Sequence, residues 1–385
     1  MREGSCSKNM QSFSAHSFDW TPAVLEQAVA EGLVPGAVVA AFHLKDASQS
    51  FVFFAGNRRI VPTHQPMLDS TVFDWASLTK PLCTAPLVFR AIQRGWLSLE
   101  TQVRSLLLDA PQSWSGITVG HLLAHSAGFR AWAPVWQELQ ARWGLRLSEV
   151  SLEQRRSEFR KHVVSEHPEV APGRRVLYSD FSFLILGFIL EDLYQLRLQQ
   201  IWERQMPGVE AGFRTVLRPA LAKQPIDESC AATEVVEWRG GALQGEVHDE
   251  NCWSLGGSAG HAGLFGNMSA LMAATRRIFD STFLDPQLRA LMLRPVIGPE
   301  GPRRTLGWDV PDGPESSAGP TLASRSGVVG HLGFTGTSLW IDQQSQWGFS
   351  VLSGRVHLGR ENTGIRKFRP RIHEALAIDL RLDAG

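Results

Sequence analysis

The stretch FDWASLTKPL, residues 73–82, places a serine and a lysine three positions apart. On a helix, residues with this spacing lie on one face, so the Lys80 amine can approach the Ser77 hydroxyl. Burial or cationic neighbours lower the pKa of a lysine, and its neutral amine can then take the serine proton. A helix start with a surface lysine is the simpler explanation of the spacing alone, so the other motifs must decide.

Two prolines lie in the helix that this stretch opens. Pro81 falls in its expected first turn, where a missing N–H group costs nothing. Ser77 is therefore expected at the helix N-terminus, where free N–H groups and the helix dipole favour an oxyanion. We expect a kink at Pro86 and a C-terminal cap at Gly95.

The composition is that of a soluble globular protein with a sizeable core. The 385 residues are 43% hydrophobic and 20% charged, and the 38 basic residues balance the 38 acidic ones. This balance gives no signal for nucleic acid or an anionic membrane as a partner. No apolar run of about 18 residues is present, so no membrane span is expected.

The N-terminus and the cysteines bear on the compartment. Residues 1–16 are polar and lack the apolar region of a signal peptide, which predicts a cytoplasmic protein. A periplasmic protein is expected instead if the natural chain begins further upstream. The four cysteines show no Cys-x-x-Cys spacing, which indicates free thiols, with Cys83 in the core. We expect no metal and no cofactor.

The order of predicted elements indicates an α+β fold. A helix capped by Thr21 opens the chain, and amphipathic or apolar patterns predict further elements along it. Strands are expected at 37–42, 50–55, 328–331, 337–341 and 347–352, and helices at 118–124, 147–164, 181–197, 269–279 and 363–380.

Strands at both ends with helices between them predict one antiparallel sheet flanked by helices, with an inserted all-helical domain. We expect a disordered tail at 1–17, a sheet domain from 18–75 and 255–385, and a mainly helical domain at 76–254. The active site is expected between the two domains.

Three further stretches matter together with Ser77 and Lys80: TVGHLLAHSAG at 118–128, PGRRVLYSD at 172–180 and GHLGFTGTS at 330–338. With them the chain resembles the serine β-lactamase/DD-peptidase superfamily, in the branch of class C β-lactamases, DD-carboxypeptidases and related esterases. GEVHDEN at 245–251 and GGSAGHAGLF at 256–265 are similar to its penicillin-binding-protein-4B-like group.

The resemblance implies the β-lactamase/transpeptidase-like fold and a role for each motif residue. Ser77 matches the acylated nucleophile, Lys80 the neighbouring base, and Tyr178 the tyrosine that relays the proton to the leaving group. His331 matches the first residue of the Lys-Thr-Gly strand, of which His-Thr-Gly is a variant, and lends a proton or partial charge near Tyr178. Gly333 completes that motif.

The resemblance also implies an oxyanion hole made by the backbone N–H groups of Phe334 and Ser77. Two positions depart from the family pattern. Asp180 stands where the archetype has asparagine, so it accepts rather than donates and can pair with Lys80. Leu332 replaces a hydroxyl residue that contacts the substrate carboxylate, which weakens recognition of a terminal D-alanine.

Other polar clusters have structural explanations. His121 and His125, spaced as a metal pair could be, match structural residues in the resemblance. Residues 248–250 are expected to cap and hydrogen-bond the loop behind the site. Glycines between 256 and 266 indicate close backbone approach, because no Gly-Lys-Ser/Thr follows. The arginines at 303–304 and 366–371 are expected to be solvated.

The resulting expectation is a serine hydrolase acting through a Ser77 acyl-enzyme on a peptide or ester, with cell-wall-related D-amino-acid substrates. Its partner would be a small-molecule or peptide substrate, and the sequence carries no signal for an oligomeric state. A carboxylesterase with the same machinery and a non-catalytic scaffold with this fold are the alternatives.

Overall fold

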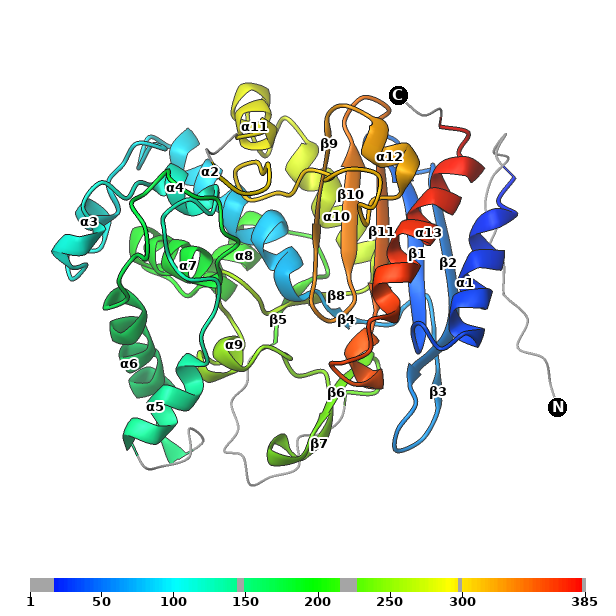
Figure 1. The fold of residues 1–385 in the computed structure, drawn as a ribbon, viewed down its shortest axis with the longest axis horizontal. Helices are drawn as coiled ribbons and strands as arrows, with labels where there is room; N and C mark the ends of the chain where they lie inside the picture. Colours follow the sequence, from blue (N-terminus) through cyan, green and yellow to red (C-terminus); the bar gives the residue numbers. More distant parts are fainter. Residues whose placement is uncertain (1–16, 144–148, 215–226, 297–299, 383–385) are drawn as a thin grey trace.

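The computed structural model describes residues 17–143, 149–214, 227–296 and 300–382, and a six-stranded sheet lies at its centre (Figure 1). The strand order is β3-β2-β1-β11-β10-β9, and neighbouring strands are antiparallel. The strands are β1 (Gly36–His43), β2 (Ser50–Arg59), β3 (Gln65–Pro66), β9 (Val328–Leu332), β10 (Ser338–Asp342) and β11 (Trp347–Ser353).

Both ends of the chain contribute to this sheet, as predicted. β1 pairs with β11 from Ala37 opposite Ser353 to His43 opposite Trp347. The second strand was expected to end at residue 55, but β2 continues to Arg59 because its last residues pair with β3. The expected tail at 1–17 lies outside the described residues except for Ser17.

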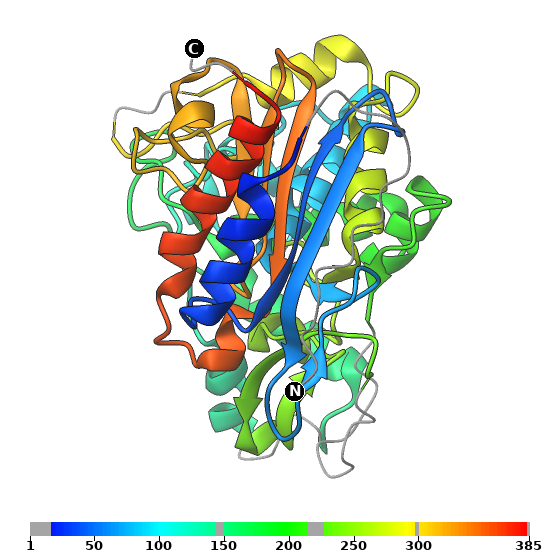
Figure 2. The ribbon, with the colours of Figure 1, turned by 90° about the vertical axis from the view of Figure 1, so that its right-hand side faces the viewer.

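Two helices, α1 (Trp20–Ala30) and α13 (Gly364–Asp379), lie side by side on one face of the sheet (Figure 2). The predicted N-cap at Thr21 is wrong, because Thr21 lies inside α1. Instead, the Asp379 carboxylate accepts hydrogen bonds from the Thr21 backbone N–H at 2.8 Å and from its hydroxyl at 2.7 Å. A carboxylate there satisfies free N–H groups and complements the helix dipole.

The opposite face of the sheet packs against α10 (Met268–Phe279) and the main core. Val39 belongs to the cluster under α1 and α13, whereas its neighbours Val38 and Ala40 belong to the core on the other side. A strand covered on both faces needs apolar side chains at every position, which explains the continuous apolar run of β1.

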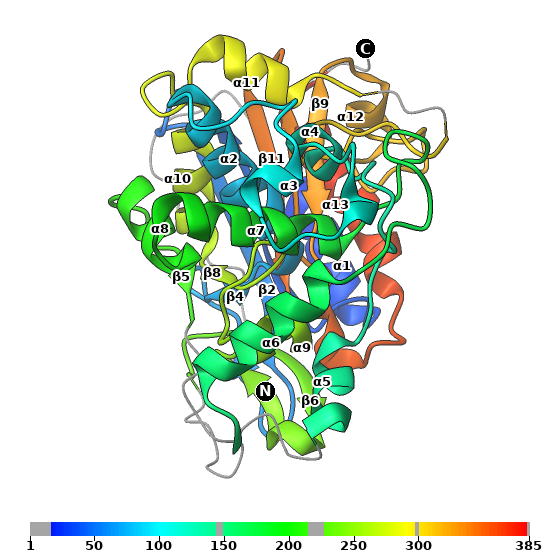
Figure 3. The same ribbon diagram turned by 90° about the vertical axis from the view of Figure 1, so that its left-hand side faces the viewer.

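Further helices lie beside the sheet (Figure 3). They are α2 (Ala85–Gln93), α3 (Val103–Leu106), α4 (Val119–Leu123), α5 (Val135–Trp143), α6 (Leu152–Val164), α7 (Asp180–Tyr194), α8 (Leu198–Gln205) and α9 (Glu250–Ser254). We propose that residues 76–254 form the inserted helical domain, since these helices fall within that range. In α7 every residue from Phe181 to Leu190 is buried.

The segment 150–167 is rich in charge of both signs, yet two of its arginines are not exposed. Arg155 and Arg156 are buried. Arg156 donates two hydrogen bonds to the Glu191 carboxylate of α7, at 2.7 and 2.6 Å. A paired guanidinium can be buried in this way, whereas an unpaired one is costly.

A small sheet joins the segment before Ser77 to the glycine-rich segment. Its order is β4 (Phe73–Asp74), β8 (Leu264–Gly266) and β5 (Gly212–Phe213). The glycines allow close packing as predicted: a Cβ at Gly260 would lie 2.0 Å from the Phe183 carbonyl oxygen.

The remaining elements complete the periphery. They are the hairpin β6 (Ala232–Val236) and β7 (Gly241–Gln244), and the helices α11 (Pro286–Leu293) and α12 (Pro320–Ser324). None of the helices in the described part of the chain is both long and apolar enough to cross a bilayer.

Candidate active site

Ser77 and Lys80 lie together at the start of the helix that leads into α2. The Lys80 Nζ donates a hydrogen bond to Ser77 Oγ at 2.9 Å. The predicted single helix is wrong here, because a 3-10 turn at Ala76–Leu78 and a π-helical turn at Lys80–Thr84 precede α2. Pro86 lacks an N–H group and its ring would clash with the carbonyl four residues earlier, and the wider turn relieves that clash.

The residue before Ser77 has an unusual backbone conformation. Ala76 has a φ of +48°, in the left-handed region that side chains other than glycine rarely adopt. The Asp74 carboxylate stabilises this turn by accepting a hydrogen bond from the Ala76 N–H at 2.8 Å. Such strained positions cluster at functional sites, where the surrounding structure holds them in place.

The turn between β9 and β10 is hydrogen-bonded to the Ser77 segment. The Thr335 hydroxyl donates to the Asp74 carbonyl at 2.8 Å, and the Thr337 hydroxyl donates to the Trp75 carbonyl at 3.0 Å. Gly333 makes this approach possible, because a Cβ there would lie 2.7 Å from the Trp75 carbonyl oxygen. The turn therefore reaches Ser77 only with glycine at this position.

Two backbone N–H groups are available for an oxyanion hole. The Ser77 N–H lies in the first turn of a 3-10 helix, where N–H groups have no intrahelical partner. The Phe334 N–H makes no backbone hydrogen bond among the described turns and loops. Both residues line one cleft, so both groups can serve a developing negative charge there.

Tyr178 precedes α7, and His125 accepts hydrogen bonds from the residues directly before and after it in the sequence. The His125 carbonyl accepts from the Leu177 N–H at 2.9 Å, and its Nδ1 accepts from the Ser179 N–H at 3.0 Å. Its ring also lies 4.7 Å from the Tyr178 ring. The expectation of a structural role for His125 therefore agrees with its contacts.

Lys80 reaches Tyr178 and Asp180 with the same ammonium group. Its Nζ lies 2.8 Å from Asp180 Oδ1 and 4.8 Å from the centre of the Tyr178 ring. Burial by itself lowers the pKa of Lys80, but the Asp180 carboxylate and the Tyr178 phenol raise it above its ordinary value. The pairing expected from Asp180 is thus present, and it favours the charged form of Lys80.

The phenol of Tyr178 lies partly covered beside this ion pair. Burial raises the pKa of Tyr178, against the lowering effect of the Lys80 ammonium. At neutral pH the resting site therefore contains a protonated Lys80 and a neutral Tyr178. Acylation requires a state with one proton fewer, because a neutral amine or a phenolate must accept the Ser77 proton.

His331 on β9 faces Tyr178 from the sheet side, with the ring centres 5.7 Å apart. Its Nδ1 lies 2.9 Å from the Leu332 carbonyl oxygen, while its buried Nε2 has no hydrogen-bond partner among the described residues. Burial lowers the pKa of His331 to about 4. A neutral imidazole has no net charge to lend to Tyr178, which leaves hydrogen bonding through Nε2.

The cleft above Ser77 has a volume of about 780 Å³. Two aromatic side chains in its lining are half-exposed, Trp132 at 47% and Phe334 at 49%. Leu332 also lines it, in the position where the family resemblance implies a hydroxyl. Five arginines also line the cleft: Arg304, Arg355, Arg360, Arg366 and Arg369.

The prediction that the arginines at 303–304 and 366–371 are solvated is wrong for two of them. Arg369 is buried and donates to the carbonyls of Gly333 and Thr337 at 2.7 and 2.6 Å. Arg304 is largely covered and pairs with Asp309. Neither contact has a sequence signal: the partners of Arg369 lie on a distant segment, and Arg304 and Asp309 share a segment without helix or strand periodicity.

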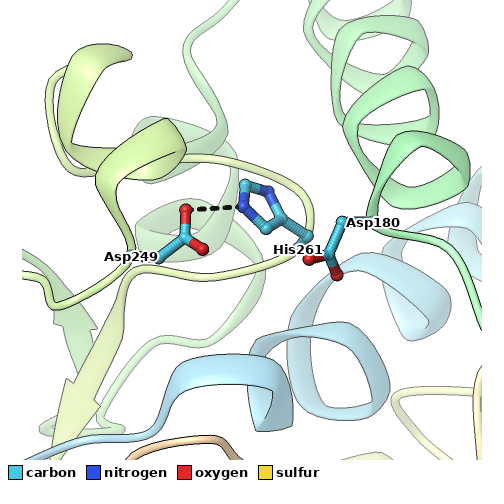
Figure 4. Close-up of side chains that lie close together, drawn as sticks. All are labelled: Asp180, Asp249 and His261. Carbon is cyan, nitrogen blue, oxygen red and sulfur yellow. Dashed lines mark hydrogen bonds and ion pairs between the residues drawn. The ribbon is translucent and has the colours of Figure 1, made fainter. Parts of the chain in front are cut away.

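Asp180, Asp249 and His261 come close enough for one cation, with ligand atoms within 4.8 Å of one another (Figure 4). Both carboxylates already have a partner, because Asp180 pairs with Lys80 and Asp249 Oδ1 lies 2.9 Å from His261 Nε2. A metal ion would compete with the Lys80 ammonium for the Asp180 carboxylate. The cluster is therefore poorly suited to bind a metal ion. The His261 carbonyl accepts from Lys80 Nζ at 3.1 Å.

Residues 248–250 hold the loop behind the site, as expected. The His248 N–H donates to the Asp74 carboxylate at 2.7 Å, and the Asp249 carboxylate caps α9 by accepting from the Cys252 N–H at 2.7 Å. Glu250 pairs with Arg360. All three also line the cleft.

A profile of the Beta-lactamase family matches residues 22–369. The chain belongs to the Beta-lactamase family. It is 28% identical over 321 residues to a Salmonella typhimurium protein named "Putative D-alanyl-D-alanine carboxypeptidase", which covers 75% of this chain and 70% of the relative.

Solved structures share the Beta-lactamase family fold. EstCE1, a hydrolase with promiscuous acyltransferase activity, superposes with a TM-score of 0.66 at 20% identity, over 92% of this chain and 96% of its own. An octameric penicillin-binding protein homologue from Pyrococcus abyssi gives a TM-score of 0.67 at 18% identity, over 94% and 77%. The predicted family and α+β fold class are confirmed.

Membership in the Beta-lactamase family and the hydrolase relatives also confirm the predicted enzyme class, a serine hydrolase of the β-lactamase-related type. The structure brings together all the predicted site residues in or beside one cleft: Ser77, Lys80, Tyr178, Asp180, His331, Gly333 and Phe334. Arg304 and His261 were missed as neighbours of this site.

Proposed function

We propose that Ser77 is the acylated nucleophile of this serine hydrolase and that its substrates are peptides or esters related to cell-wall D-amino acids. The observation that carries the proposal is the 2.9 Å hydrogen bond from Lys80 Nζ to Ser77 Oγ at the floor of the cleft. A scaffold that had kept only the fold would have no need for this contact or for the free N–H groups beside it.

The reaction steps follow from which groups in the site carry a proton. Ser77 Oγ attacks the substrate carbonyl carbon, and its proton passes to the deprotonated member of the Lys80–Tyr178 pair. The oxyanion accepts hydrogen bonds from the backbone N–H groups of Ser77 and Phe334. Tyr178 then returns the proton to the leaving oxygen or nitrogen, which leaves an acyl ester on Ser77.

Deacylation reverses these roles. Water or an amine attacks the ester carbonyl and gives its proton to the same pair, and Ser77 leaves with a proton. The buried Nε2 of His331 lies beside Tyr178 without a described partner, so it can accept a hydrogen bond from the attacking group.

A second candidate, a carboxylesterase with the same machinery, is favoured by Leu332. A leucine side chain in the cleft cannot hydrogen-bond a substrate carboxylate, whereas an uncharged ester loses nothing there. The aromatic side chains of Trp132 and Phe334 offer apolar contact area to an acyl group.

Two measurements test the proposal. Intact-protein mass spectrometry with a fluorophosphonate should show one adduct on the wild type and none on Ser77→Ala, while the exposed Ser115→Ala control keeps the adduct. The absence of an adduct with any serine-reactive probe would contradict catalysis by Ser77. Turnover of a p-nitrophenyl acyl ester, a chromogenic cephalosporin and a D-Ala-D-Ala peptide then separates the esterase from the peptidase.

A further inference from the structure

The segment 300–309 connects the two walls of the cleft. On the helical side, the Val176 N–H donates to the Glu300 carbonyl at 2.8 Å, two residues before Tyr178. On the sheet side, Asp309 and Gly330 exchange two backbone hydrogen bonds, at 2.7 and 2.9 Å, next to His331. The segment is therefore anchored close to Tyr178 on one side of the cleft and close to His331 on the other.

Arg304 projects from this segment onto Tyr178. Its guanidinium carbon lies 5.0 Å from the centre of the Tyr178 ring. The side chain is 15% exposed, and its Nη1 pairs with Asp309. Its Nε is buried without a hydrogen-bond partner among the described residues. A cation that packs so closely on an aromatic face is attracted by the ring, and more strongly by a phenolate.

Four further titratable groups face Tyr178. Lys80 and Asp180 form an ion pair and largely offset each other. The rings of His125 and His331 lie 4.7 and 5.7 Å away, and burial lowers the pKa of both imidazoles, so neither is charged at neutral pH. The strand that faces Tyr178 therefore supplies no cation of its own.

We propose that Arg304 is a positioning residue for Tyr178. Its guanidinium holds the phenol ring beside Lys80 and supplies the fixed positive charge that favours the phenolate. Asp309 orients the guanidinium from the β9 side and moderates its charge. The inference rests on the proposed role of Tyr178 in proton transfer, but its first test measures the ionisation of Tyr178 directly.

The sequence makes that test direct, because the chain has only two tyrosines, Tyr178 and Tyr194. The Tyr194 hydroxyl has no hydrogen-bond partner among the described residues, so Tyr194→Phe should be tolerated. In that background, Tyr178 labelled with 13C at Cζ gives one NMR signal whose shift reports its ionisation. We expect the titration to move to higher pH in Arg304→Gln and back towards the wild type in Arg304→Lys.

Asp309→Asn should shift the same titration to lower pH, because it leaves the guanidinium charge unopposed. This opposite sign keeps the inference testable even if Arg304→Gln folds poorly. The neighbouring Arg303, which is exposed, provides the matched control, and Arg303→Gln should leave the signal unchanged. An Arg304→Gln titration equal to that of the control, or an upward shift in Asp309→Asn, overturns the proposal.

Kinetics provide the second readout. With an ester substrate, Arg304→Gln should lower kcat/KM at neutral pH by about tenfold and move the limb on which kcat/KM rises with pH to higher pH. If the pH dependence of kcat/KM stays unchanged although the Tyr178 titration shifts, Tyr178 is not the residue that relays the proton. A shifted limb without a shifted titration refutes Arg304 as its positioning residue.

Discussion

The Lys80 ammonium lies 2.8 Å from the Asp180 carboxylate and donates a hydrogen bond to the Ser77 hydroxyl at 2.9 Å. One side chain thus joins the candidate nucleophile to a partly buried carboxylate. The anion raises the pKa of Lys80 although burial lowers it. The residue that the sequence identifies as a base is therefore held in its acidic form, and the site must lose a proton before it can act.

Asp180→Asn should shift the activity profile towards lower pH. Without the carboxylate, burial dominates and the pKa of Lys80 falls, so the deprotonated form appears at a lower pH. The limb on which kcat/KM for an ester substrate rises with pH should move to lower pH accordingly. Asp192→Asn is the matched control, because Asp192 lies on the same helix and pairs with Arg160 near the surface. A limb that stays in place would show that Asp180 does not set it.

Leu332→Thr should change the substrate preference. Threonine places a hydroxyl where leucine offers only methyl groups to the cleft, and that hydroxyl can donate a hydrogen bond to a substrate carboxylate. Turnover of a D-Ala-D-Ala peptide relative to a p-nitrophenyl ester should rise by about tenfold, as one charged hydrogen bond allows. Leu332→Val controls for shape, because valine matches threonine without the hydroxyl. Equal ratios in both variants would remove Leu332 as the cause of the preference.

Gly333→Ala should disable the oxyanion hole. The added Cβ would lie 2.0 Å from Thr337 Oγ1 and 2.7 Å from the Trp75 carbonyl oxygen, so the turn that carries Phe334 must shift. Losing one oxyanion donor costs about a hundredfold in kcat or more. Gly212→Ala is the control, because its Cβ meets nothing within 4 Å. Stopped-flow acylation that is equally fast in both variants would argue against this oxyanion hole.

Stability should fall in mild acid because of buried histidines. Burial lowers the pKa of His331 and His373 to about 4, and lowers that of His125 well below its ordinary value. Below pH 6.5 the unfolded chain therefore binds protons that the folded chain resists. The free energy of unfolding should decrease between pH 6.5 and 4, by up to about 1.4 kcal/mol per pH unit for each histidine.

Urea unfolding at several pH values measures this slope. His373→Gln should reduce it by the contribution of one proton, and the exposed His64→Gln should leave it unchanged. His373 lies on α13, away from the cleft lining, so its replacement separates stability from activity. A slope in His373→Gln equal to that of the wild type would contradict the assignment.

The sequence determined the fold class and the main catalytic residues because both depend on local patterns. The alternation and apolar runs of β1, β9 and β11 follow from the two-residue period of strands, and the sheet uses them as predicted. Ser77 and Lys80 are three residues apart, so almost any helical turn brings their side chains together.

Only the tertiary structure decided the contacts between distant segments. Asp379 caps α1 across the chain, in place of the local cap expected at Thr21. Arg304 contacts Tyr178 from a segment with no periodic pattern. Nothing local encodes either pair, because each depends on where separate segments are placed by the packing of the whole core.

The same division applies to the chemistry. Residue types identified Lys80 as a candidate base, but its protonation depends on burial and on the Asp180 carboxylate, which only the folded chain brings within 2.8 Å. Charge interactions fall off with distance and grow in a low dielectric, so the properties of Lys80, Tyr178 and His331 arise from the assembled cleft.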